Sequence, residues 1–169
     1  MLNIAAFTFN YDPLEDRILL VGNHNNGQQR IDFWLTRKLI LRLLSAAGEL
    51  FEKTSEDIAG AAEQHKAELA QFHHDHAQND FVVEQGEEIA SVEAYNPKLL
   101  CRLDISHQSG NYRLLFFTGG DKPVAVSILT YSELHQIFYL IHRGAVSLEW
   151  GVDNQLFRTA SVHSTTTLQ

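Results

Sequence analysis

The sequence predicts an α+β protein in which a three-stranded antiparallel β-meander followed by a helix occurs twice, the two copies packed as one body. The segments FWLTRKLILRLLSAAG (33–48) and SILTYSELHQIFYLIHRG (127–144) each place Leu-Thr after a strand-like run and before an amphipathic run that stops at a glycine. Strand-like patterns also coincide when the chain is shifted by 96 residues, and the helical patterns coincide at 94. Agreement of several elements in order and spacing indicates an internal repeat.

The first copy occupies residues 1–54. Phe7 and Phe9 alternate with Thr8 and Asn10, which is the period of a half-buried strand. YDPLED and GNHNNG are typical turn sequences, and Thr36 is a suitable cap for the helix that follows. The expected strands are residues 4–10, 17–21 and 29–34.

The second copy occupies residues 97–152, with expected strands at 99–106, 112–118 and 124–128. Thr130 and Glu133 form the T-x-x-E pattern of a capping box at the start of a helix. A further strand is expected at 145–152, and residues 153–169 are expected to form an edge strand and a disordered tail. One meander with one helix cannot bury both faces of its sheet, so we expect the two copies to complete a single structural domain.

Charge is distributed unevenly along the chain. The formal net charge is −8, yet residues 55–96 carry ten acidic side chains and one lysine, while the flanking copies are almost neutral. No apolar run has the length of a membrane span, and the first residues lack a secretory pattern, so we expect a cytoplasmic protein. The single cysteine, Cys101, lies in LLCRL, where we expect a buried, inert thiol.

The acidic insert, residues 55–96, contains a pattern typical of a helix from about Glu56 to Ala77. Apolar residues and histidines recur there at spacings of four and three, which is a heptad seam. A stripe this narrow can pack against one other helix, so we expect the chain to self-associate as a homodimer. We also expect an unknown protein partner. The seam consists of Ile58, Ala62, His65, Leu69, Phe72 and His76.

Chemistry-bearing motifs are scarce. The chain has no GxSxG, P-loop, GxGxxG or HExxH pattern, so no catalytic residue is assigned, no cofactor is expected, and an enzyme is disfavoured. His73 and His76 have the i, i+3 spacing that two ligands of one metal ion can use. Leu69 and Phe72 on the same face instead favour a histidine cluster without metal.

Arginine and aromatic residues recur on neighbouring expected strands, with Arg17 and Arg113 at equivalent positions of the repeat. In topology alone, repeated meander-plus-helix modules resemble the PUR-repeat and whirly families of single-strand nucleic-acid binders. That resemblance implies a sheet that presents aromatic and basic residues to unstacked bases. No motif of those families is matched, so no site residue is carried over. The residues that could form such a platform are Arg17, Arg113, Tyr112, Phe116 and Trp34.

Three hypotheses for function follow. The first is a noncatalytic interaction or scaffold protein that self-associates through the central helix. The second is a sheet-based single-stranded nucleic-acid binder, although the acidic insert and the near-neutral copies do not favour nucleic acid. The third is a small metal-dependent protein or enzyme that uses His73 and His76.

Overall fold

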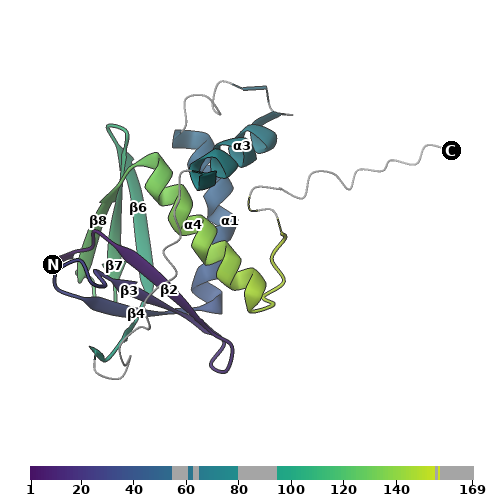
Figure 1. Ribbon diagram of the computed structural model, residues 1–169. Helices are drawn as coiled ribbons and strands as arrows, with labels where there is room; N and C mark the ends of the chain where they lie inside the picture. Colours follow the sequence, from purple (N-terminus) through teal and green to yellow (C-terminus); the bar gives the residue numbers. More distant parts are fainter. Residues whose placement is uncertain (55–60, 63–64, 80–94, 155, 157–169) are drawn as a thin grey trace.

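The computed structural model describes residues 1–54, 61–62, 65–79, 95–154 and 156, and it has an α+β fold with two four-stranded sheets (Figure 1). No helix in this part of the chain is both long and apolar enough to cross a membrane. The elements in chain order are β1 (Leu2–Asn3), β2 (Phe7–Asp12), β3 (Arg17–Gly22), β4 (Ile31–Thr36), α1 (Arg37–Thr54), α3 (Lys66–Asn79), β5 (Lys98–Leu99), β6 (Arg102–Gln108), β7 (Asn111–Phe117), β8 (Ala125–Leu129) and α4 (Tyr131–Ser147).

Each sheet is a meander of three consecutive strands with one very short strand added. Sheet A has the order β1-β8-β7-β6, and sheet B has the order β2-β3-β4-β5. The added strand in each case comes from the other half of the chain and runs parallel to its neighbour: β1 beside β8, and β5 beside β4. The two halves therefore exchange strands, which ties both sheets into one body.

The exchange breaks two expected strands. Residues 4–10 and 99–106 were each expected to form one strand, but the chain crosses from one sheet to the other at Ile4 and at Leu100. Ile4 N donates to Val126 O at 2.8 Å, and Leu100 N donates to Trp34 O at 2.9 Å. Both side chains are almost completely buried. Each crossing thus keeps its backbone hydrogen bonds while a large aliphatic side chain enters the core.

The strands expected at 17–21, 29–34, 112–118 and 124–128 are confirmed, as are the helix starts after Thr36 and Thr130. Leu39 N donates to Thr36 Oγ1 at 3.3 Å, and the capping box at Thr130 and Glu133 is complete. Ser109 and Gly110 have φ angles of 53° and 78°, which suits a two-residue hairpin turn between β6 and β7.

The strand expected at 145–152 is wrong. Helix α4 passes through Gly144 and ends only at Ser147, and residues 148–152 contain no strand. Trp150 is buried there, and its indole N–H donates to Asp16 in the β2–β3 turn. The apolar residues of this segment therefore pack against the rest of the protein and do not form a β-strand.

Helices α1, α3 and α4 of the described residues lie on the same side of the two sheets, and the core lies between these helices and the sheets (Figure 1). The sheets meet through Phe33 of β4 and Phe116 of β7, whose stacked rings have centroids 5.5 Å apart. Phe51 of α1 packs edge-on against Tyr112 of β7 and Phe138 of α4. One cluster of buried side chains thus joins both halves of the chain.

Helix α3 packs within the same chain against α4 and α1. Ala70 of this helix is buried, and Leu69 packs at the margin of the core. The expected continuous helix from Glu56 to Ala77 is wrong at 61–62, which are not helical, so α3 begins only at Lys66. The remainder of the expected insert, 55–60, 63–64 and 80–94, lies outside the described residues.

Candidate interaction surface

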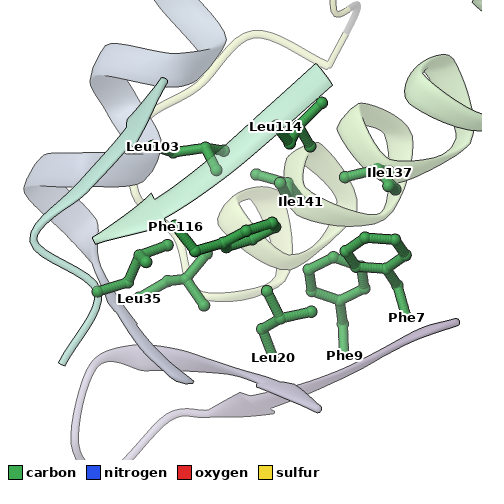
Figure 2. Close-up of a pocket in the computed structure, with 10 residues that line it drawn as sticks. Phe7, Phe9, Leu20, Leu35, Leu103, Leu114, Phe116, Ile137 and Ile141 are labelled. Carbon is green, nitrogen blue, oxygen red and sulfur yellow. The ribbon is translucent and has the colours of Figure 1, made fainter. Parts of the chain in front are cut away.

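The space between the two sheets and α4 is too small for a substrate. Figure 2 shows the space between the two sheets and α4, which has a volume of about 10 Å³. A cavity of this size holds about one water molecule at most, and an apolar one stays dry. It is therefore a gap in packing. Its lining is entirely apolar: Phe7, Phe9, Leu20, Leu35, Leu100, Leu103, Leu114, Phe116, Ile137 and Ile141.

Buried polar side chains serve the fold. Ser127 Oγ donates to Ile4 O at 2.7 Å and holds the chain where it crosses between the sheets. His142 Nε2 donates to Asp153 O at 2.6 Å and fixes the segment after α4. The ring of His135 packs 3.7 Å from that of Phe51. These contacts stabilise helix and chain positions, and none of them places a nucleophile beside a base.

A buried ion pair lies at the start of β4. Arg30 donates to both carboxylate oxygens of Asp32 at 2.8 and 2.6 Å, and the Asp32 side chain is fully buried. The hydrogen bond to Asp32 raises the pKa of Arg30, and the Tyr95 ring lies 3.8 Å from the guanidinium carbon. This arrangement satisfies both charges and ties the chain before β5 to the outer side of sheet B.

The outer face of sheet A, on the side opposite the helices, carries an exposed apolar residue beside an arginine. Arg113 of β7 lies directly opposite Ile128 of β8, and Ile128 is 60% exposed. Leu115 and Val126 form the next pair on this face and are half-buried. We call Arg113, Leu115, Val126 and Ile128 the outer patch. An exposed isoleucine flanked by apolar neighbours and a cation is typical of a contact surface.

Arginines also stack on aromatic rings on both outer faces. The guanidinium of Arg102 lies 3.8 Å from the Phe117 ring on sheet A, and that of Arg17 lies 3.5 Å from the Trp34 ring on sheet B. Arg17 also pairs with Glu15. Leu99, opposite Trp34 in β5, is 52% exposed. Both outer faces therefore combine cationic and apolar groups.

The five residues of the expected nucleic-acid platform do not come together. Arg17 and Trp34 lie on the outer face of sheet B, and Arg113 lies on that of sheet A. Tyr112 and Phe116 point into the core and are each 1% exposed, so their rings do not face solvent. Tyr112 Oη is 2.5 Å from Thr54 Oγ1 at the end of α1. Alternation along β7 assigns these two rings to the face opposite Arg113.

The residues of the expected seam have different environments. Ala62 and His65 are exposed, Leu69 is half-buried against the core of its own chain, and Phe72 is 61% exposed. The Nδ1 atom of His65 lies 3.5 Å from Oε2 of Glu68. Ile58 and the side chain of His76 lie outside the described residues. Self-association through this seam stays a prediction.

The metal hypothesis is likewise untested. His73 and His76 belong to α3, but their side chains lie outside the described part of the chain. Among the residues that the structure describes, no three His, Cys, Asp or Glu side chains are grouped to hold a metal ion.

Cys101 is exposed, so the expectation of a buried thiol is wrong. It follows Leu100, where the chain crosses between sheets, and Leu100 rather than Cys101 enters the core. The apolar neighbours of Cys101 in the sequence therefore belong to two different sheets, which the pattern LLCRL does not reveal.

Comparison of the chain with protein-family models, with curated proteins and with solved structures gave no match. The outer patch itself was missed from the sequence. Its signal was present in β8, where Val126 and Ile128 alternate with Ala125, Ser127 and Leu129. Apolar residues on both faces of a strand can indicate a second contact on the outer face.

Proposed function

We propose that the protein is a noncatalytic interaction protein that binds a protein partner through the outer patch of sheet A. The observation that carries this proposal is the exposed Ile128 beside Arg113, on the side of the sheets opposite the helices. The space between the two sheets and α4 is too small for a ligand, which favours binding at a surface over chemistry in that space. The partner should offer an apolar surface for Ile128 and a carboxylate for Arg113.

The proposed origin of this body is a duplication. A shift of 94 residues converts the pair Ile18–Leu35 into the pair Tyr112–Leu129, and the same shift relates Thr36 to Thr130. Strand exchange is also reciprocal. With this shift Arg17 corresponds to Asn111 rather than to Arg113. The two arginines therefore have no common role through the repeat, and the outer patch belongs to sheet A alone.

Affinity capture from native extract tests the proposal. Wild type is compared with Ile128→Glu, which buries a charge in the proposed contact, and with the matched control Leu14→Glu. Leu14 is 95% exposed in the turn between β2 and β3, away from the outer patch. We expect Ile128→Glu to lose the captured protein, Leu14→Glu to retain it, and nuclease treatment to leave it unchanged. Equal capture by all three chains contradicts the proposal.

A second candidate, single-stranded nucleic-acid binding, is favoured by the two arginine–aromatic pairs on the outer faces. Arginine and aromatic planes both stack on unpaired bases. Fluorescence anisotropy of a labelled single strand provides the test. This candidate requires binding that weakens with salt and is lost when both Arg17→Ala and Arg102→Ala are introduced. Binding that is insensitive to salt, or no binding, contradicts it.

The expected seam of α3 provides a further proposed contact. Phe72 is its exposed apolar residue within the described chain. If α3 mediates self-association, Phe72→Ser should weaken it while leaving the outer patch intact.

A further inference from the structure

We propose that two copies of this chain associate through strand β6, pairing it antiparallel with β6 of the second copy about a twofold axis at Ile105. This contact is independent of the outer patch, since it uses the edge of sheet A rather than its face. It would join two four-stranded sheets into one continuous sheet.

Strand β6 is an edge with the features of a pairing surface. It pairs with β7 over its full length without a bulge, and within the described residues it has a strand neighbour on that side only. It contains no proline and no lysine, which are common protections of free edges. An edge strand presents unpaired N–H and C=O groups at every second residue, and these are available to another strand.

The other long edge, β2, is much less accessible. Only Asn10 is exposed in β2, whereas Arg102, Asp104, Ser106, His107 and Gln108 are exposed in β6. The remaining two edges, β1 and β5, are two-residue strands. Among the described strands, β6 is therefore the best suited to accept a partner.

The side chains of β6 complement themselves in one register. With Ile105 opposite Ile105, all of β6 is paired, and Arg102 lies opposite Gln108 of the second copy. Asp104 then lies opposite Ser106, so no like charges face each other. Ile105, which is half-buried at the margin of the core, faces Ile105 of the second copy, and Leu103 lies diagonal to that residue, so both gain apolar cover.

The neighbouring registers are worse. An axis at Asp104 places two aspartates directly opposite each other, which is destabilising. An axis at Ser106 limits pairing to residues 104–108. An isologous contact of this kind closes on itself, so the expected product is a dimer rather than a fibre.

A matched pair of substitutions at Gln108 tests the register. Gln108→Glu places a carboxylate opposite Arg102 of the second copy, and Gln108→Lys places a cation there. The residue directly opposite Gln108 within the chain is Asn111, which is neutral, so neither substitution creates a directly opposed ion pair in the monomer. Because the pair occurs twice, we expect a roughly threefold to tenfold tighter dimer for Gln108→Glu and a similar weakening for Gln108→Lys.

Sedimentation equilibrium over a concentration series gives the dissociation constants, with the dimer at twice the 19.2 kDa mass of the chain. Ser106→Lys provides an independent check, because it places a cation opposite Asp104 of the second copy and beside its own Arg113. It should tighten the dimer while lowering the stability of the monomer.

Three outcomes would overturn the proposal: a monomer at every concentration, a dimer equally tight in both Gln108 variants, or a dimer lost in Phe72→Ser but unchanged by the Gln108 substitutions. The last result would assign the dimer to α3. Failure of this proposal leaves the outer patch intact, because capture by wild type and Ile128→Glu is measured separately.

Discussion

The ring of Tyr11 in β2 lies against the backbone of Gly144 in α4, and its hydroxyl donates to the carbonyl of Leu140 at 2.7 Å. A Cβ atom at position 144 would come within 2.6 Å of Tyr11 Cδ1 and 2.9 Å of Ile18 Cδ1. Helix α4, from the second half of the chain, therefore sits directly on the sheet of the first half. Gly144 allows this close approach.

Substitution of two helical glycines should have opposite effects on stability. Gly144→Ala should lower the free energy of unfolding by about 1–3 kcal/mol, because the methyl group overpacks the contact with Tyr11. Gly48→Ala in α1 meets nothing within 4 Å and should raise it by up to about 1 kcal/mol, because alanine favours a helix. Urea unfolding measures both variants. Effects of the same sign would contradict the close packing of α4 on sheet B.

Stability should fall at high pH because of Tyr11. Burial raises the pKa of Tyr11 to about 12 from an ordinary value of 10.0. Between these values the unfolded chain binds fewer protons than the folded protein, so the free energy of unfolding decreases as pH rises. Tyr11→Phe should reduce this decrease. Burial also raises the pKa of Tyr112, but that contribution is common to both proteins.

Urea midpoints at pH 8 and near pH 11 give the comparison. A loss of stability that is equal in wild type and Tyr11→Phe would show that the phenol of Tyr11 ionises normally in the folded protein.

Asn23 should be among the most sensitive polar residues. Its side chain accepts from Ala5 N at 2.9 Å and donates to Asn3 O at 2.8 Å and to Gln29 O at 3.0 Å. Asn23→Gly keeps the positive φ of 62° accessible but leaves these groups without their partner, so we expect a loss of about 3 kcal/mol.

The control for the Asn23→Gly substitution is Asn26→Ala, which changes a residue of the same turn. Asn26 donates to Asn23 and accepts from Gln28 N at the surface, so its loss should cost about 1 kcal/mol or less. Similar losses for Asn23→Gly and Asn26→Ala, measured by urea unfolding, would show that Asn23 does not hold the N-terminal crossing.

Cys101 should react with a disulfide-exchange thiol reagent in the folded protein. The residue is exposed, so we expect one thiol per chain to react without denaturant, and Cys101→Ser to abolish the signal. A reaction that requires urea would place Cys101 in the interior and contradict the crossing at Leu100.

The sequence predicts most strands and both helix starts because local chemistry determines them. Alternation identifies β2, turn sequences on both sides delimit β3, and Thr130 with Glu133 marks the start of α4. The expected stops at glycine were wrong: α1 continues past Gly48 and α4 past Gly144. A glycine inside a helix is tolerated where close packing offsets its low helix propensity. The contact of Tyr11 with Gly144 is such a case, and it is visible only in the tertiary structure.

Strand exchange is not visible in the sequence for a related reason. The apolar pattern is similar whether a strand continues in one sheet or crosses to another, so nothing local distinguishes Ile4 or Leu100 from an ordinary core residue. Arg113 was identified as a candidate, but its neighbour Ile128 was not. Their proximity depends on the register between β7 and β8, which the sequence alone does not supply.

Amide hydrogen exchange of the captured complex tests most directly whether the protein binds through the outer patch. We expect added protection in peptides that cover β7 and β8 of sheet A, and we expect it to be absent for Ile128→Glu. Added protection confined to α3, with β7 and β8 unchanged, would contradict it.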